Sequence, residues 1–201
     1  MTLVARDLVK VYGERRVVDG MSLTAQSGRI IGLLGPNGAG KTTTFLMMIG
    51  FIAADAGVIL LNGEDISQHP FYRRARLGIG YLPQEPSVFT RATVEENLNL
   101  VLERGNAGKH LSTVRDEILR DFGLDGLAKQ RAGRLSAGER RRLEIARCLA
   151  TDPSFILLDE PFSGIDPISI ADLQEHVTAL RERNIGLVIT DHNVRDTLSI
   201  T

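Results

Sequence analysis

The chain has 201 residues and a mass of 22.0 kDa, which suffices for one substantial domain but not for two ordinary domains with a long linker. Hydrophobic residues make up 43% and charged residues 24%, so the disordered and fibrous classes are excluded. The 24 Lys and Arg residues against 25 Asp and Glu residues give a formal charge of -1, which argues against a chain that coats nucleic acid, and we expect no nucleic-acid partner.

The chain also lacks the signals of export or membrane insertion. The single cysteine, Cys148, cannot form an internal disulfide, which favours a reducing cytosol. The first residues carry no charged segment followed by a long apolar one, so they do not form a signal peptide. The longest apolar run, residues 45–54, is shorter than the ~20 residues that span a bilayer and favours a buried core helix. We expect a soluble protein that reaches a membrane only through a partner.

Apolar clusters alternate with helical patterns along the chain. The predicted strands are residues 17–23, 29–34, 58–61, 79–82, 155–158 and 187–190. The predicted helices are residues 42–52, 94–102, 112–122, 137–150 and 168–183. This alternation indicates an α/β domain with a mostly parallel sheet, and the all-apolar segment at 155–158 is typical of a strand buried on both faces. Residues 86–150 show helices without a convincing strand and are interpreted as a helical insertion.

A glycine-rich loop lies between the strand at 29–34 and the helix at 42–52. Its residues are Gly35, Pro36, Asn37, Gly38, Ala39, Gly40, Lys41, Thr42 and Thr43. They fit the phosphate-loop pattern in its required setting of strand, loop and helix. Glycines let the backbone approach a phosphate closely, and the N–H groups that open the helix face the anion. Lys41 is expected to reach the β- and γ-phosphates and the Thr42 hydroxyl to bind Mg²⁺, so the sequence predicts a nucleotide site.

Two carboxylates follow the buried strand at 155–158. Asp159 is expected at the carboxyl edge of the sheet, where ligands of parallel sheets bind, and to hold the metal ion. Glu160 follows it directly and is a candidate general base that activates water against a γ-phosphate. An acidic pair in these two roles predicts hydrolysis rather than binding alone.

Further motifs, taken together, resemble those of ATP-binding cassette (ABC) proteins. Residues 135–139 (Leu-Ser-Ala-Gly-Glu) resemble the family's Leu-Ser-Gly-Gly-Gln signature, with Ala137 and Glu139 as departures. Tyr12 matches the aromatic residue that stacks on adenine, Gln84 the glutamine of the loop after its strand, and His192 the switch histidine. Residues 163–166 match the loop that follows the acidic pair. The resemblance covers essentially the whole chain.

The resemblance implies a particular fold and set of ligands. The expected fold is a P-loop NTPase with a RecA-like α/β core and an antiparallel β subdomain, plus a helical subdomain that carries the signature. The core is expected to comprise residues 1–85 and 151–201 of a single domain, and the helical subdomain residues 86–150. ATP and Mg²⁺ are the expected ligands, with Gln84 and His192 acting at the γ-phosphate and Gln84 also at the metal. Family members usually continue beyond this chain's last residue, so we expect a missing C-terminal tail.

The resemblance also implies partners. In the family, two cassettes pair head to tail, and each ATP lies between one phosphate loop and the other signature, so we expect a homodimer in which Ser136 and Gly138 contact the partner's ATP. Two integral-membrane permease subunits are expected to dock near Phe89 and Arg91, on the cytoplasmic face of the inner membrane. The alternative for this pair is that Phe89 is buried in the helical subdomain and Arg91 is solvated.

The transport system is inferred from resemblance alone. Residues 81–85, 135–147, 159–169 and 190–198 are similar to those of the lipopolysaccharide-export ATPases of Gram-negative bacteria. The alternatives are a branched-chain amino acid importer ATPase and a non-transport ABC ATPase. Three other features receive plain interpretations: residues 140–142 (Arg-Arg-Arg) as a solvated or interface face, His69, His110 and His176 as surface residues, and Cys148 as a packing residue.

Overall fold

A computed structural model describes residues 1–105 and 111–191 of the chain. Its strands are β1 (Thr2–Tyr12), β2 (Arg15–Gln26), β3 (Ile30–Leu34), β4 (Ala56–Leu61), β5 (Glu64–Asp65), β6 (Ile79–Leu82), β7 (Phe155–Asp159) and β8 (Gly186–Asp191). Its α-helices are α1 (Lys41–Met48), α2 (Phe71–Arg76), α3 (Val94–Gly105), α4 (Leu111–Asp121), α5 (Ala137–Leu149) and α6 (Pro167–Glu182). Short 3-10 turns lie at Asp125–Leu127 and Ala132–Arg134.

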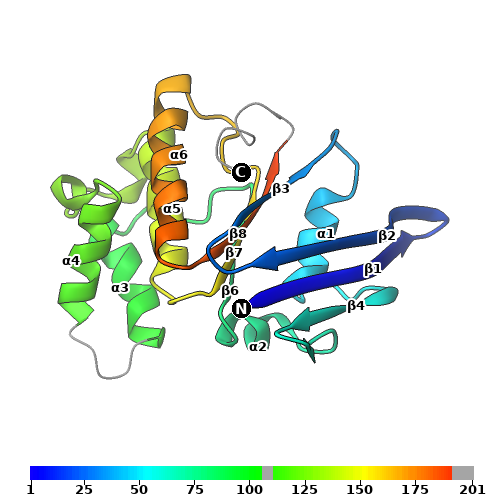
Figure 1. Ribbon diagram of the computed structural model, residues 1–201. Coiled ribbons are helices and arrows are strands. Elements are labelled where there is room, and N and C mark those ends of the chain that lie inside the picture. Colours follow the sequence, from blue (N-terminus) through cyan, green and yellow to red (C-terminus); the bar gives the residue numbers. More distant parts are fainter. Residues whose placement is uncertain (106–110, 192–201) are drawn as a thin grey trace.

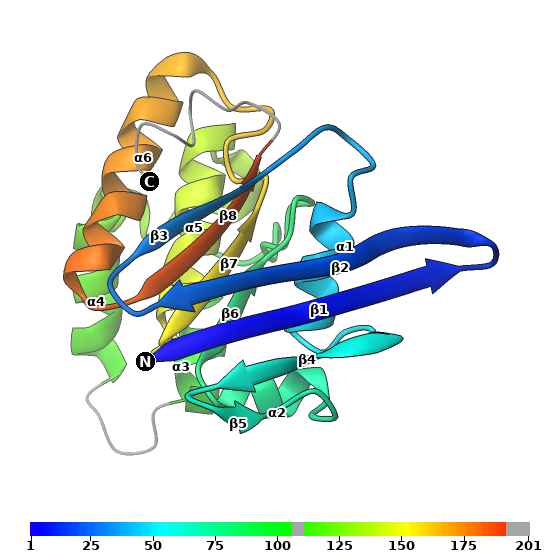
Figure 2. The ribbon, with the colours of Figure 1, turned by 45° about the vertical axis from the view of Figure 1, so that its right-hand side comes forward.

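The described strands form two separate sheets (Figures 1 and 2). One sheet is antiparallel, in the order β2-β1-β4-β5, and the other is parallel, in the order β3-β8-β7-β6. The alternation of elements predicted only the parallel sheet, whereas the resemblance implied both. β1 was missed because Asp7 adopts a left-handed backbone (φ 51°) at a shift in register, which breaks the alternation of buried side chains. β5 and α2 were missed as well, and both are short.

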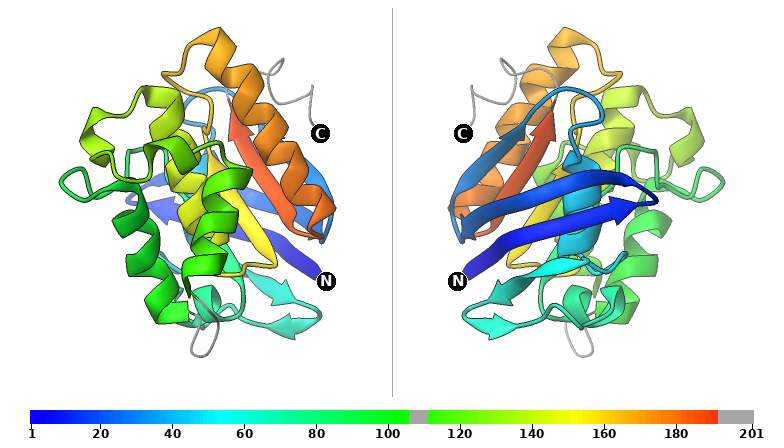
Figure 3. Two further views of the ribbon diagram at one scale, coloured as in Figure 1. Left: turned by 90° about the vertical axis from the view of Figure 1, so that its left-hand side faces the viewer. Right: turned by 90° about the vertical axis from the view of Figure 1, so that its right-hand side faces the viewer.

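Helix α1 lies between the two sheets (Figure 3). Phe45, Met47 and Met48 of α1 pack with residues of β1 on one side and with Phe155 and Leu157 of β7 on the other. The intervening β7 residues, Ile156 and Leu158, belong to a second core formed with α3, α4, α5 and α6. Successive side chains of a strand point to opposite faces, so β7 is covered on both sides, as its uniformly apolar sequence predicted.

The helical insertion forms a layer on the far side of the parallel sheet (Figures 1 and 3). Within it, α3, α4 and α5 pack against one another, and α5 also contacts β6 and α6. In the described part of residues 86–150 there is no strand, only an isolated bridge between Thr93 and Arg131. The subdomain boundaries at 85/86 and 150/151 stay a prediction. Among the described residues, every helix is too short or too polar to cross a bilayer.

Helix α1 ends earlier than the apolar run predicted. The predicted helix at 42–52 ends at Met48, because Gly50 adopts a left-handed backbone (φ 76°) that stops the helix. The buried Arg74 of α2 donates hydrogen bonds to the carbonyl oxygens of Met47 (2.7 Å) and Met48 (2.8 Å). These bonds provide side-chain partners for carbonyl groups in the last turn of α1, where the regular hydrogen bonding of the helix ends. Phe51 then turns outward and is 68% exposed, so the run 45–54 is not a single buried helix.

The loops after the parallel strands meet at one edge of the sheet. β3 pairs with β8 and β8 with β7 in parallel register, so that Asp159 lies opposite Thr190. The phosphate loop follows β3, Glu160 follows β7 and Gln84 follows β6 closely. The carboxyl ends of parallel strands are the usual place for ligands in α/β sheets. The fold therefore gathers most of the predicted site at this edge.

Candidate active site

The phosphate loop, residues 35–40, connects β3 to α1 in a conformation that needs glycine. Gly40 has φ 85°, and a Cβ atom added there would lie 2.5 Å from the carbonyl oxygen of Val17. Gly38 is also left-handed, at φ 79°. Gly40 is the N-cap of α1 and no side chain caps the helix, so its first N–H groups remain available. The loop and the open helix end together present the N–H groups that an anion site requires.

Lys41 lies across its own loop. Its side chain is buried, and its ammonium group donates hydrogen bonds to the carbonyl oxygens of Gly35 (2.8 Å) and Pro36 (3.1 Å). Within the described residues, the Lys41 ammonium is thus held by backbone carbonyl groups of the loop and pairs with no acidic side chain.

A cavity of about 390 Å³ opens above the loop. The residues that line it are Arg15, Val17, Asn37, Gly38, Gly40, Lys41, Thr42, Thr43, Gln84 and Glu160. The structure therefore brings together eight of the predicted site residues from three separate loops. The analysis of the sequence missed Arg15 and Val17, which come from β2. The only signal for them was their place just after Tyr12.

Gln84 and Glu160 face each other across the cavity. The side-chain amide of Gln84 donates a hydrogen bond to the Glu160 carboxylate at 2.9 Å. Glu160 has a left-handed backbone (φ 44°), which is uncommon for a residue with a side chain and is often associated with functional sites. The acid predicted as general base is therefore positioned beside the glutamine predicted to act with it.

Asp159, the last residue of β7, is almost completely buried, at 1% exposure, and does not line the cavity. Its two carboxylate oxygens accept hydrogen bonds from hydroxyl groups, one from Thr190 at 2.5 Å and one from Tyr81 at 3.3 Å. Burial and then the Asp159 charge raise the pKa of the Tyr81 phenol, so this group keeps its proton and remains a donor.

The residues predicted to bind the metal fit Mg²⁺. Thr42, Gln84 and Asp159 supply hydroxyl, amide and carboxylate oxygens, which are the hard donors that Mg²⁺ prefers. In the described ranges there is no cluster of three or more His, Cys, Asp or Glu side chains able to hold a metal. A site with one carboxylate is completed by phosphate oxygens of a nucleotide, which is the usual arrangement for Mg²⁺.

The signature begins helix α5 but does not line the cavity. The Ser136 hydroxyl accepts a hydrogen bond from the Glu139 N–H (3.3 Å), and the Glu139 carboxylate accepts one from the Ser136 N–H (2.8 Å). This reciprocal capping box gives Glu139 a role in capping the N-terminus of α5. A Cβ atom added at Gly138 would lie 2.7 Å from that of Ser169, so this glycine allows close packing against α6.

Two other predicted site residues lie apart from the cavity or outside the described residues. Tyr12 ends β1, is 51% exposed and has the Lys10 ammonium 5.5 Å from its ring centroid. An exposed ring is accessible to a base, but Tyr12 does not line the cavity. His192 lies outside the described residues.

The interpretation of residues 140–142 as a solvated or interface face is wrong for the middle arginine, which is buried inside its own chain. Arg141 is buried and donates hydrogen bonds to the carbonyl oxygens of Pro83 (2.8 Å), Asp159 (3.1 Å) and Pro161 (3.0 Å). It also pairs with the buried Glu144 at 2.9 Å. Arg141 therefore connects α5 to the loop that carries Gln84 and to the acidic pair.

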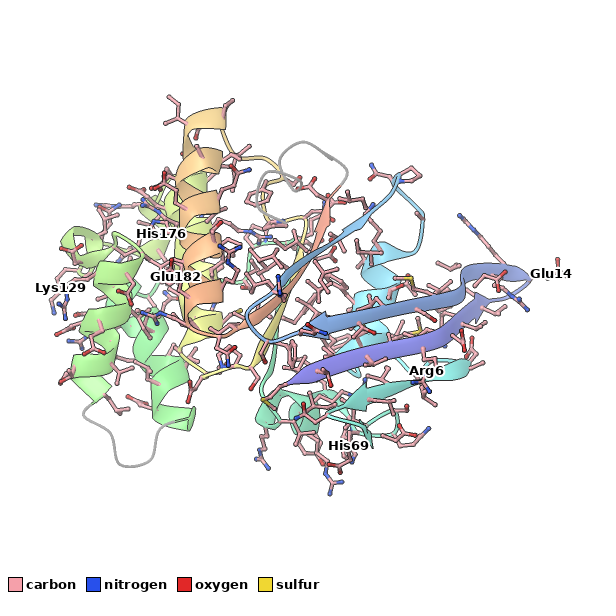
Figure 4. The ribbon with its side chains drawn as sticks, in the orientation of Figure 1. Arg6, Glu14, His69, Lys129, His176 and Glu182 are labelled. Atoms are coloured by element: carbon pink, nitrogen blue, oxygen red, sulfur yellow. The ribbon has the colours of Figure 1, made fainter. Side chains whose placement is uncertain are left out.

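Three smaller predictions are refined. His69, beside α2, and His176, on α6, are half-buried rather than fully exposed (Figure 4). His176 stacks on Phe122 at 5.3 Å, and His110 lies outside the described residues. Cys148 packs against the helical core, and burial raises the pKa of its thiol to about 11, which agrees with a packing role.

The family model described as ABC transporter matches residues 18–163. The chain belongs to the ABC transporter family. Among solved structures, a nucleotide-free ATP-binding cassette from an ABC transporter shares 30% identity with this chain, with a TM-score of 0.88 over 100% of this chain and 85% of that one. A cassette in its ADP conformation, also at 30% identity, gives a TM-score of 0.86 with the same coverage. The predicted ABC fold and the predicted ATPase class are confirmed.

Curated ABC relatives match over nearly the whole chain. The lipopolysaccharide export system ATP-binding protein LptB of Escherichia coli strain K12 is 51% identical over 99% of this chain and 83% of its own length. LptB of Haemophilus influenzae is 52% identical over 98% of this chain and 83% of its own length. An uncharacterized ABC transporter ATP-binding protein of Rhizobium meliloti is 56% identical over 99% of this chain and 74% of its length. The predicted resemblance to lipopolysaccharide-export ATPases is confirmed.

Proposed function

We propose that this ABC protein hydrolyses ATP to drive the extraction of lipopolysaccharide from the inner membrane and its export. The observation that carries this proposal is the identity of 51–52% to the LptB proteins of E. coli and H. influenzae over nearly the whole chain. The cavity at the phosphate loop supports the same reaction, because it combines an anion site with an acid suited to activate water.

The reaction is assigned to residues from separate elements. The N–H groups of the loop and Lys41 hold the β- and γ-phosphates, and Tyr12 stacks on adenine. Glu160 accepts a proton from the attacking water, and Gln84, 2.9 Å away, orients that carboxylate. His192 contacts the γ-phosphate in this scheme.

The metal ion is assigned to Thr42, Gln84 and Asp159 together with the phosphate oxygens. Mg²⁺ bound there would supply positive charge that offsets the negative charge developing on the phosphates during transfer. The Gln84 amide nitrogen is engaged with Glu160, which leaves its oxygen as the donor for a metal. Asp159 contributes the carboxylate.

We assign the signature of each chain to the ATP site of a second copy of the chain. Ser136 and Gly138 do not line the cavity that contains Lys41, so a single chain does not close its own site. We assign them to the ATP of the partner in a head-to-tail homodimer, where the hydroxyl and the helix N-terminus face the γ-phosphate. Hydrolysis then weakens the interface, and the dimer opens.

The permease subunits are assigned to the surface around Phe89. Phe89 is 51% exposed, Arg91 is exposed beside it, and the Arg147 guanidinium lies 4.9 Å from the Phe89 ring centroid. Exposed aromatic and arginine side chains are typical of binding hot spots. Two permease subunits docked on two such surfaces would place the dimer on the cytoplasmic face of the inner membrane.

The Glu160→Gln variant tests the hydrolytic assignment. The amide retains the size of the side chain but removes the base, so hydrolysis is expected to slow by about 10²- to 10⁴-fold while ATP still binds. Steady-state phosphate release and ATP binding by calorimetry measure the two effects. Lys41→Ala is the contrasting variant: it removes the cation that binds the phosphates, so it should weaken nucleotide binding. Turnover of Glu160→Gln near that of the parent protein would contradict the assignment.

A further inference from the structure

Thr190 connects the two acids of the site from a neighbouring strand. It lies on β8 opposite Asp159, and its side chain is completely buried. Its hydroxyl lies 2.5 Å from one Asp159 carboxylate oxygen and 3.1 Å from the Glu160 amide nitrogen. The carbonyl oxygen of Thr190 accepts a second bond from the same Glu160 N–H, at 3.0 Å.

The direction of each hydrogen bond follows from the groups involved. The carboxylate of Asp159 can only accept, and the N–H of Glu160 can only donate. The Thr190 hydroxyl therefore donates its one hydrogen to Asp159 and accepts from Glu160. One side chain thus orients both the carboxylate of Asp159 and the backbone of Glu160.

The Thr190 hydroxyl is a polar group in an otherwise apolar part of β8. Residues 187–189 of β8 are apolar and fully buried, and a valine at 190 would have nearly the same shape as threonine. A buried hydroxyl in such a strand is stabilising only where its bonds are satisfied. Here they are satisfied by Asp159 and by Glu160, whose left-handed backbone (φ 44°) is strained and needs external support.

The other oxygen of Asp159 is held independently. The Tyr81 hydroxyl of β6 lies 3.3 Å from it, on the opposite side of β7 from Thr190. Each carboxylate oxygen has two lone pairs, so one hydrogen bond to each leaves lone pairs free for a metal ion or its water. Hydrogen bonds to a metal ligand from its neighbours fix the direction in which that ligand presents those lone pairs.

We propose that Thr190 is a positioning residue of this ATPase: its hydroxyl aims the Asp159 carboxylate at the metal and holds the Glu160 backbone in the conformation that hydrolysis requires. This inference rests on the proposed function, in which Asp159 binds the metal and Glu160 is the base. It assigns the role to the hydroxyl and not to the size of the side chain.

The test compares Thr190→Val, which removes the hydroxyl at nearly constant volume, with Thr190→Ser, which keeps it. Mn²⁺ serves as the probe, and its affinity is measured by electron paramagnetic resonance on ATP-loaded protein that also carries Glu160→Gln to prevent turnover. Loss of a hydrogen-bond partner of a metal ligand typically lowers metal affinity 10- to 100-fold, so Thr190→Val is expected to weaken Mn²⁺ binding by about 10-fold or more. In the protein with native Glu160, kcat should fall by a similar factor with KM for ATP changed less, and Thr190→Ser should recover most of both.

Thr151→Val is the matched control, because this exposed hydroxyl donates to the Cys148 carbonyl oxygen at the end of α5, away from the two acids. Thermal unfolding identifies variants that fail to fold, and Tyr81→Phe then provides a second route, since it removes only the bond to the other Asp159 oxygen and should also weaken Mn²⁺ binding. Mn²⁺ affinity and kcat of folded Thr190→Val within twofold of the parent would overturn the proposal, as would Thr190→Ser being as impaired as Thr190→Val. Failure of the proposed function is separate: Glu160→Gln alone would then hydrolyse ATP at the parent rate.

Discussion

Arg15 and Arg16 are adjacent on β2, yet their surroundings differ. Arg15 lines the phosphate cavity, and within the described part of the chain its guanidinium has neither an ion pair nor a hydrogen bond. Its guanidinium lies 4.0 Å from the Cβ position of Gly38 in the phosphate loop. Arg16 instead pairs with Asp19 at 2.8 Å on the exposed surface. A guanidinium that faces a phosphate loop can bind phosphate through two parallel N–H bonds.

We therefore predict that Arg15 adds a cation to the nucleotide site. Arg15→Ala is expected to weaken ATP binding about threefold to tenfold, a moderate effect because the side chain is exposed and screened by solvent. Arg16→Ala is the matched control and should change the affinity by less than about twofold, because exposed ion pairs contribute little. Calorimetric titration with ATP measures both. Equal losses of ATP affinity in the two variants would show that the effect comes from the net charge of the protein and not from a contact made by Arg15.

Arg141 shows where prediction from the sequence reached its limit at single residues. The phosphate loop, Gln84 and the acidic pair were located because motif spacing fixes them relative to strands and helices. The three arginines carried no such spacing, so charge alone suggested a solvated face. Arg141 lies three residues after Gly138 and four before Ile145, on the buried face of α5, and this helical period was the available signal. Besides Glu144 on the same helix, its partners are backbone carbonyl groups of distant segments, which no sequence pattern reveals.

At the scale of elements, the segment between β6 and α3 is held rigidly although it lies on the surface. The Ser87 N–H donates to Glu144 at 2.6 Å, and Arg147 donates to the Ser87 carbonyl oxygen at 2.6 Å. Phe89 is fixed to α3, because its N–H donates to the Asn97 side chain at 2.9 Å and its carbonyl oxygen accepts from it at 3.0 Å. The segment that presents Phe89 is therefore coupled to α5, the helix that begins at the signature.

This coupling gives a prediction for the docking surface. Phe89→Ala and Arg91→Glu are expected to abolish copurification of the ATPase with its membrane subunits. ATP hydrolysis by the isolated protein should stay within about twofold, because both side chains are exposed in the single chain. Leu100→Ala is the matched control, as Leu100 is an exposed apolar residue of neighbouring α3. A marked fall in melting temperature of Phe89→Ala with assembly intact would place the docking surface elsewhere.

At the scale of the whole molecule, the order of elements could be predicted well, but their ends could not. Each described helix and strand that periodicity predicted is present, whereas α1 stops at Met48 because of Gly50 and Arg74, a partner 26 residues away. The separation of the strands into two sheets around α1 also depends on long-range pairing, which a window along the sequence does not contain. The resulting fold places the signature and the phosphate loop in different parts of one chain.

The central claim is that two copies of this chain form each ATP site together, and mixing two inactive variants tests it most directly. Lys41→Ala removes the phosphate cation of one half-site, and Ser136→Arg blocks the signature of the other. Mixed dimers contain one site with both defects and one with neither, so random mixing should restore about a quarter of the parent ATPase activity. A mixture as inactive as its two components, with mixed dimers present by mass spectrometry, would contradict the account.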